Sequence, residues 1–208
     1  MKKTNSQLIN PLYLGKELQS EMQEFFTENV FIQLTEFMKK EHNTFKKNIL
    51  NSNYFKKIYD PLIESKSKLN LKEEFSLEII KYVEFFKSKE FIHFLEDIVE
   101  FSLQIKSLSI VKYSHKDFIL LNDIKKSQDD CLEVFFDLSD PWKEEYGGSQ
   151  TYTTKEEEIL HLEPQYNTLT ILYKPEEVMK YLKYINNKAK DKNILRIEIQ
   201  FDIVEIEN

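Results

Sequence analysis

The sequence predicts an α+β fold in which helices come first and a β core, of the sandwich or jelly-roll kind, comes second. In the first half, Phe, Leu and Ile recur at spacings of three and four residues with charges between them, which is the period of an amphipathic helix. From about residue 105 the apolar runs become short and are separated by turn-forming residues. A chain of 208 residues can bury one core, so we expect a single domain over 1–208. Residues 1–104 would form a mainly helical supporting part and residues 105–208 the β core.

The helical part contains two segments with the helical period, residues 16–40 and residues 73–103. Between them, Pro61 and the polar run at residues 64–70 ("ESKSKLN") predict a loop.

Five short runs in the second half have the composition and alternation of strands. They are residues 105–113, 131–139, 159–163, 168–174 and 193–206. The last run alternates most clearly. One of its faces carries Leu195, Ile197, Ile199, Phe201 and Ile203, and the other carries Arg196, Glu198, Gln200 and Asp202. Residues 176–190 fit a helix or a strand equally well by pattern.

Composition narrows the classes of function. The net charge is −7 and the isoelectric point is near 5.3, which argues against a nucleic-acid partner because phosphate binding needs a concentrated positive face. No apolar stretch is long enough to span a bilayer and no secretory leader follows Met1, so we expect no membrane partner and a soluble, cytoplasmic protein. The one cysteine, Cys131, lies in an apolar run that predicts a buried thiol. The oligomeric state stays open.

Two local features suggest metal or anion chemistry. His115 and Asp117 are two residues apart, so on a strand they would face the same way and could bind one metal ion. This triplet is common by chance and also fits a surface turn. Arg196 is the single arginine among 29 basic residues. Its planar fork suits a carboxylate or phosphate partner, although chance retention at a surface would also explain it.

Glycine supplies a third feature. The chain has three glycines, and two of them, Gly147 and Gly148, are adjacent shortly after the only tryptophan, Trp142. In a chain with so little glycine, the pair predicts backbone with unusual dihedral angles or a close approach of another segment. A plain hairpin turn explains the pair equally.

Four segments, in order, resemble the 2-oxoglutarate and Fe(II)-dependent oxygenases of the prolyl-hydroxylase-like group. They are "YSHKDFILLND", "LEVFFDLSDPWKEEYGGSQTY", "LEPQYNTLTILYK" and "MKYLKYINNKAKDKNILRIEI", and together they cover roughly residues 105–205. The resemblance implies a double-stranded β-helix (jelly-roll) core preceded and buttressed by the N-terminal helices. It also implies Fe(II) and 2-oxoglutarate as cofactors, oxygen as a further substrate, and hydroxylation of a protein side chain or a small molecule.

The resemblance also assigns roles to residues. It points to His115 and Asp117 as iron ligands and to Arg196 as the partner of the distal carboxylate of 2-oxoglutarate, with the polar face around Arg196 lining the barrel interior. The third ligand departs from the family. Asn187, nine residues before Arg196, stands where relatives with a similar segment carry a histidine, and its neutral amide oxygen is a weak ligand for Fe(II).

Two further departures concern the cosubstrate. Phe135 occupies a strand position where some relatives present a tyrosine hydroxyl, and Tyr113 is the candidate that could supply a hydroxyl instead. Glu198 lies two residues after Arg196 and could compete for its guanidinium.

Three interpretations follow. The first is a 2-oxoglutarate and Fe(II)-dependent dioxygenase that binds iron through His115, Asp117, Asn187 and water. The second is a catalytically inactive jelly roll that binds a carboxylate ligand or a partner protein. The third places the function in the helical half, as an interaction module.

Overall fold

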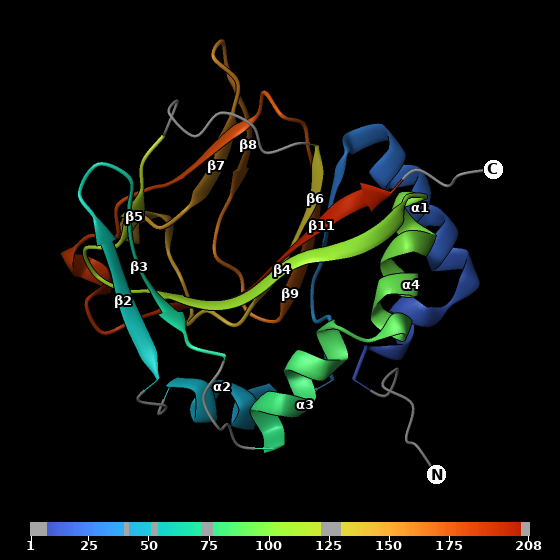
Figure 1. Ribbon diagram of the computed structural model, residues 1–208, viewed down its shortest axis with the longest axis horizontal. Coiled ribbons are helices and arrows are strands. Elements are labelled where there is room, and N and C mark those ends of the chain that lie inside the picture. The colour runs from blue at the N-terminus through green and yellow to red at the C-terminus, as the bar shows by residue number, and fades with distance from the viewer. Residues whose placement is uncertain (1–7, 40–41, 51–53, 72–76, 122–129, 205–208) are drawn as a thin grey trace.

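The computed structural model describes residues 8–39, 42–50, 54–71, 77–121 and 130–204 (Figure 1). These residues form one curled antiparallel sheet of eleven strands. The first six strands are β1 (Phe31–Leu34), β2 (Phe55–Asp60), β3 (Glu64–Leu69), β4 (Ser102–Tyr113), β5 (Phe118–Ile119) and β6 (Cys131–Asp137). The others are β7 (Gln150–Thr153), β8 (Glu158–Leu162), β9 (Thr168–Lys174), β10 (Met179–Leu182) and β11 (Ile194–Val204).

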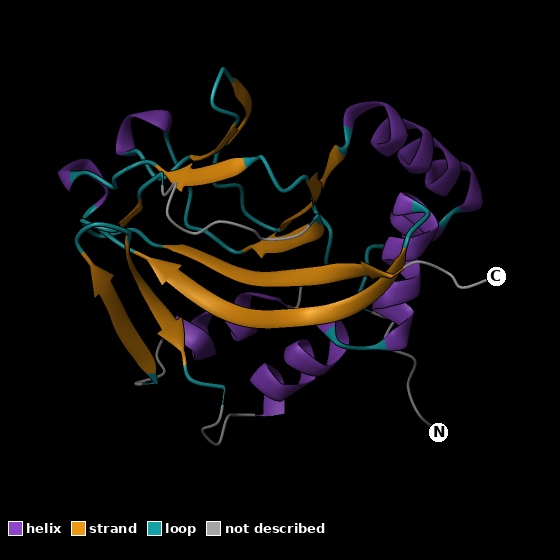
Figure 2. Cartoon of the chain, turned by 45° about the horizontal axis from the view of Figure 1, so that its top comes forward, coloured by secondary structure: helices purple, strands orange, loops and turns teal. Residues whose placement is uncertain are grey.

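The strand order is that of a jelly roll. One layer runs β1-β9-β6-β11-β4 and the other runs β5-β10-β7-β8. The strand β3 joins the layers because it pairs with both β4 and β5, and β2 pairs with its outer edge. The sheet curls so that the two layers lie opposite each other (Figure 2). The expected α+β fold with a double-stranded β-helix core is therefore confirmed.

Four α-helices cover the outer face of the first layer (Figure 1). They are α1 (Lys16–Asn29), α2 (His42–Leu50), α3 (Leu77–Phe86) and α4 (Lys89–Val99). Short 3₁₀ helices span Pro11–Leu14, Glu144–Tyr146 and Asn187–Ala189. The large core joins the odd-numbered face of β11 to the phenylalanines of α3 and α4. Each such side chain stabilises the fold by about 1.5–3 kcal/mol on full burial.

Two segments of the first half differ from the sequence prediction. The first helix ends at Asn29, since Val30 adopts a left-handed conformation with φ 55°. Residues 31–34 then pair with β9 instead of continuing the helix, and their alternate side chains are buried. The loop expected at residues 64–70 is also wrong, because β2 and β3 form a hairpin there. A polar strand is stable at this place because much of β3 stays only half-buried.

The ambiguous segment at residues 176–190 forms the short strand β10 followed by a 3₁₀ helix. Cys131 is buried as expected, and burial raises the pKa of its thiol. Within the described residues, no helix combines the length and the apolar character needed to cross a membrane.

Candidate functional site

The even-numbered face of β11 points into the barrel. Arg196 has no exposed surface, and Glu198 and Gln200 line a cavity of about 330 Å³. The expectation that this polar face lines the barrel interior is confirmed. The strand register explains the neighbours, because β11 and β6 place Arg196 opposite Asp137 and Gln200 opposite Glu133.

Arg196 is held by two polar side chains and one ring. Its Nε donates to Asp137 Oδ2 at 2.8 Å, and its Nη1 donates to Gln150 Oε1 at 2.7 Å. The guanidinium lies 5.0 Å from the centroid of the Phe135 ring. Nη2 is buried and has no hydrogen-bond partner among the described residues. The charge of Arg196 is therefore already compensated by Asp137, and one nitrogen is left to receive a further acceptor.

The electrostatics of this pair follow from its burial. Burial alone lowers the pKa of the Arg196 guanidinium, but the Asp137 carboxylate outweighs burial and holds that pKa above its usual value. Arg196 therefore stays charged in the barrel, as a pair with Asp137.

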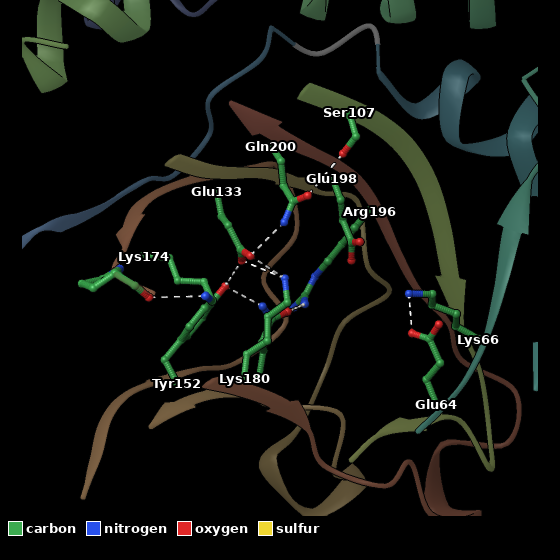
Figure 3. Close-up of polar contacts among 12 residues, drawn as sticks. Glu64, Lys66, Ser107, Glu133, Tyr152, Lys174, Lys180, Arg196, Glu198 and Gln200 are labelled. Atoms are coloured by element: carbon green, nitrogen blue, oxygen red, sulfur yellow. Dashed lines mark hydrogen bonds and ion pairs between the residues drawn. The ribbon is translucent and has the colours of Figure 1, made fainter. Parts of the chain in front are cut away.

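A second ion pair lies beside it, in which Glu133 is buried and the Lys180 side chain is 30% exposed (Figure 3). Lys180 Nζ donates to both oxygens of Glu133 at 2.8 Å, and the Tyr152 hydroxyl donates to Glu133 Oε2 at 2.8 Å. Gln150 Nε2 donates to the Tyr152 hydroxyl at 2.6 Å. A continuous chain of hydrogen bonds thus runs from Lys180 through Glu133, Tyr152 and Gln150 to Arg196.

The pKa shifts in this series of hydrogen bonds favour the charged forms of Glu133 and Lys180. Burial alone raises the pKa of the Glu133 carboxyl, but Lys180 and the Tyr152 hydroxyl together bring it below its usual value. Burial alone lowers the pKa of Lys180, and the Glu133 carboxylate more than reverses this. Burial and the neighbouring Glu133 carboxylate raise the pKa of Tyr152 well above its usual value, so its hydroxyl remains a hydrogen-bond donor.

Tyr113 lines the same cavity, but its hydroxyl is already engaged. It donates to Glu198 Oε1 at 2.9 Å. Burial and the Glu198 carboxylate raise the pKa of this phenol well above its usual value. Glu198, which could have competed for Arg196, accepts a hydrogen bond from Tyr113 and acts on Arg196 through its charge.

The H-x-D pair lies in a turn and not on a strand. Strand β4 ends at Tyr113, and Lys116 takes a left-handed conformation with φ 76°. Asp117 N donates to the carbonyl of Ser114 at 2.9 Å and closes the turn. The expectation that His115 and Asp117 share a strand face is therefore wrong. His115 is half-buried, whereas Asp117 is fully buried.

The carboxylate of Asp117 already has several donors. Its Oδ1 accepts from Ser65 Oγ at 2.6 Å and from Lys57 Nζ, and its Oδ2 accepts from Ser114 N at 2.9 Å. These contacts tie the β2–β3 hairpin to the turn after β4. A metal ion at Asp117 would have to displace Lys57.

Asn187 begins the 3₁₀ helix after β10, and its side chain is exposed. The segment just before it does lie beside the H-x-D turn. Lys116 N donates to the carbonyl of Ile185 at 2.9 Å, and Ile185 N donates to the carbonyl of Asp117 at 3.0 Å. The fold thus brings the neighbourhoods of the three predicted ligands together.

The described residues do not supply an iron centre in this arrangement. Residues 8–39, 42–50, 54–71, 77–121 and 130–204 contain no group of three or more His, Cys, Asp or Glu side chains that could hold a metal ion. The barrel interior fits a carboxylate ligand in part, because Arg196 Nη2 has no hydrogen-bond partner among the described residues and could donate to that ligand. The assignment of His115, Asp117 and Asn187 to iron, and of Arg196 and Tyr113 to the cosubstrate, stays a prediction.

The glycine pair has the unusual backbone that the sequence indicates. Gly147 and Gly148 have φ values of +72° and +78°. A Cβ on Gly147 would lie 2.1 Å from the carbonyl oxygen of Tyr184. The Trp142 indole N–H donates to the carbonyl of Gly147 at 2.6 Å and fixes this loop beside the end of β10.

The sequence reasoning missed most of the interior network. Glu133, Asp137, Gln150, Tyr152 and Lys180 were not singled out. A signal for two of them was present, because Glu133 and Asp137 lie four positions apart in an otherwise apolar strand. Charges on alternate positions of such a strand share one face with Phe135 and so mark a polar barrel interior.

Comparisons with known proteins agree with this fold. Residues 56–208 match the family model described as oxoglutarate and iron-dependent oxygenase degradation C-term. A prolyl hydroxylase from Trichoplax adhaerens, solved with a peptide of the oxygen degradation domain of hypoxia inducible factor, is similar in structure with a TM-score of 0.69. It is 12% identical, and the alignment covers 94% of each chain. A prolyl-4-hydroxylase from Pseudomonas putida has a TM-score of 0.64 and 10% identity, over 90% of this chain and 100% of that one.

Two curated relatives are similar in sequence over part of their length. Prolyl 3-hydroxylase OGFOD1 of Xenopus laevis is 31% identical over 85 residues, which is 39% of this chain and 17% of the relative. Prolyl 3-hydroxylase OGFOD1 of Mus musculus is 33% identical over 79 residues, which is 36% of this chain and 14% of the relative. The matched segment therefore spans less than a fifth of either relative.

Proposed function

Because the chain belongs to the family of oxoglutarate and iron-dependent oxygenase degradation C-terminal domains, we propose that it is a 2-oxoglutarate and Fe(II)-dependent dioxygenase-like protein that acts in hydroxylation. The substrate would be a protein side chain or a small molecule. Besides the family and the fold, one observation carries this proposal. The buried Arg196 points into the barrel and keeps Nη2 without a partner, which is the donor that a carboxylate of a cosubstrate requires.

In this proposal the chain's own residues bind and orient the cosubstrate. Arg196 Nη2 donates to its distal carboxylate, the Phe135 ring covers the guanidinium, and Tyr113 is held in the cavity by Glu198. His115 and Asp117 are the candidate iron ligands with Asn187, and iron at Asp117 would require Lys57 to leave that carboxylate. Iron and 2-oxoglutarate, when bound, would supply the oxidising chemistry.

The substrate class is also part of the proposal. The relatives named above are prolyl hydroxylases, and one of them was solved with a peptide. A prolyl residue of a protein is therefore the first substrate to examine. Oxygen would be the second substrate. The protein would act in the cytoplasm.

A second candidate function is a catalytically inactive barrel that binds a carboxylate ligand or a partner protein. Two observations at the predicted metal ligands are consistent with it. The carboxylate of Asp117 is fully engaged by Lys57, Ser65 and Ser114, and Asn187 is exposed on its 3₁₀ helix.

An anaerobic titration of Fe(II) and 2-oxoglutarate into the metal-free protein tests the first candidate. The readout is the visible charge-transfer band of the ternary complex, measured on the wild type and on His115→Ala, Asn187→His and Arg196→Lys. A wild-type band that His115→Ala abolishes and Arg196→Lys weakens supports the dioxygenase. A band only in Asn187→His supports the inactive barrel, and no band in any folded variant refutes the dioxygenase.

A further inference from the structure

An apolar groove of about 520 Å³ lies on the second layer of the sheet. Two four-residue segments line it, Phe118–Leu121 at β5 and Tyr181–Tyr184 at the end of β10. The strands β5 and β10 pair through Ile119 and Leu182, so the two segments lie side by side. Ile119 and Leu120 also line the barrel cavity, and the groove therefore borders that cavity.

Large apolar side chains around this groove are open to solvent. Leu120, Leu121 and Tyr184 are 43%, 45% and 49% exposed. Leu120 N donates to the carbonyl of Ile63 at 2.7 Å, which holds the tip of the β2–β3 hairpin at the groove. Leu62, on that tip, is 80% exposed. Apolar side chains scattered singly over a surface need no explanation, but side chains gathered around one hollow indicate a surface that a partner covers.

Two lysines give the groove a positive end. Lys183 lines the groove and is exposed. Lys116 lies next to it, because Lys116 N donates to the carbonyl of Ile185 at 2.9 Å, and it is exposed as well. Neither amine forms an ion pair or a hydrogen bond with another of the described residues. A carboxylate of a partner would therefore find two amines ready to donate.

The carboxylates near the groove have donors of their own. Asp117, directly before Phe118, is buried and accepts from Lys57. Glu158 accepts from the Tyr181 hydroxyl at 2.6 Å, so its negative charge lies on the Tyr181 side of the groove. An acidic group of a partner is thus favoured at the Lys183 end and disfavoured at the other.

The dimensions of the groove fit a short segment of chain. At about 3.3 Å per residue, the four residues of each wall span about 13 Å. A stable interface between two folded proteins has about 20–30 residues on each side, and eight line this groove. An α-helix, about 10–12 Å in diameter, is nearly as wide as the groove is long. A few residues of extended chain, with side chains that enter from one face, match the groove better than a helix or a folded protein.

We propose that this groove binds a short extended segment of a partner protein, with two apolar side chains in the groove and an acidic residue at Lys183. Residues i and i+2 of an extended chain share a face, so two apolar residues separated by one polar residue would enter together. The site requires neither iron nor 2-oxoglutarate. Its test is therefore independent of the charge-transfer titration.

Amide chemical shifts of the ¹⁵N-labelled, metal-free wild type locate the binding site without any variant. The probe is the peptide acetyl-Asp-Leu-Ser-Leu-Asp-amide. One comparison peptide has lysine in place of both aspartates, and another has serine in place of both leucines. We expect saturable shifts gathered on Phe118–Leu121 and Tyr181–Tyr184, at least about threefold weaker binding of the lysine peptide, and no saturation by the serine peptide. The absence of such shifts, shifts that miss both segments, or equal binding of the lysine peptide overturns the proposal.

Variants of the groove assign the contributions. Leu121→Ser should weaken binding of the probe at least about fivefold, because the leucine loses its apolar contact. Leu14→Ser is the matched control, since Leu14 is 40% exposed on the 3₁₀ helix Pro11–Leu14, and it should leave binding unchanged. Lys183→Gln should weaken binding about two- to threefold, and Lys16→Gln, at an exposed lysine of α1, should not. Equal effects of Leu121→Ser and Leu14→Ser contradict the proposed groove.

Sedimentation of the wild type and of Leu121→Ser examines two other occupants, a lipid surface and a second copy of this chain. We expect no difference between the two proteins in cosedimentation with phosphatidylcholine vesicles or in oligomeric state. Binding to vesicles that Leu121→Ser abolishes would assign the groove to a lipid surface. A dimer that Leu121→Ser dissociates would assign it to a second copy, and either result overturns the peptide segment as the occupant.

Discussion

Removal of the counterion of Arg196 provides a sharp test of the barrel interior. The substitution Asp137→Asn keeps the shape of the side chain and an oxygen acceptor, but it removes the negative charge. The side chains of Arg196 and Asp137 are 1% and 4% exposed, so water cannot replace the lost partner. Breaking one member of a pair buried to this degree costs about 3–5 kcal/mol of unfolding free energy.

A control on β11, the strand that carries Arg196, isolates burial as the cause. Asp202 pairs with Lys106 at 2.8 Å, but these side chains are 45% and 39% exposed. Asp202→Asn should therefore cost no more than about 1 kcal/mol. A double variant, Asp137→Asn with Arg196→Met, removes both buried charges and should lose less stability than Asp137→Asn alone.

Urea unfolding at neutral pH measures these differences. The fluorescence of Trp142, the only tryptophan, reports the transition because its indole N–H is hydrogen-bonded to the carbonyl of Gly147 in the folded protein. With a slope of about 2–3 kcal/mol per molar, the midpoint of Asp137→Asn should fall by about 1–2 M. A loss below about 1 kcal/mol, or an equal loss in Asp202→Asn, would refute the claim that Asp137 is the counterion of a buried charge.

Two further predictions concern the loop and the second ion pair. Gly147→Ala places a Cβ 2.1 Å from the carbonyl oxygen of Tyr184, so thermal unfolding should show a large loss of stability, of about 3 kcal/mol or more. Gly15→Ala, whose Cβ meets only Leu12 O at 3.6 Å, should change stability little. The folded pKa of Glu133 lies below its usual value of 4.5, so its contribution to stability is present above pH 4.5 and is lost as the pH falls through the folded pKa. Glu133→Gln should therefore lose stability less steeply than the wild type in acid denaturation curves, and an unchanged acid limb would contradict the charged pair.

The β core was the part of the fold that the sequence predicted well. Residues 168–174 and 194–204 are rich in β-branched residues, residues 194–204 also alternate clearly, and both strands lie inside the first layer. Residues 31–34 were missed because their apolar spacing also fits the helix before them. Only the left-handed Val30 and the free edge of β9 decide that they form a strand.

The direction of a site residue could be predicted from the sequence where it depends only on the strand that carries the residue. Arg196 lies on an alternating strand, so the pattern assigned it to the polar face, and the resemblance to the oxygenases implied that this face points into the barrel. His115 and Asp117 lie two residues apart in a segment too short to reveal a turn. Two of the three partners of the Asp117 carboxylate come from the β2–β3 hairpin, more than 50 residues away in the chain. Sequence spacing contains no information on such contacts.

The charges of the barrel interior separate two requirements that one arginine was expected to meet. A cosubstrate site needs a cation that is both buried and uncompensated. Arg196 is buried, but Asp137 compensates it and leaves only Nη2 for a ligand. Lys174 is buried as well, and its charge interacts with the carboxylates of Glu133 and Asp130. A carboxylate that entered the barrel would therefore gain a hydrogen bond from Arg196 Nη2 more than it would gain from a net positive charge.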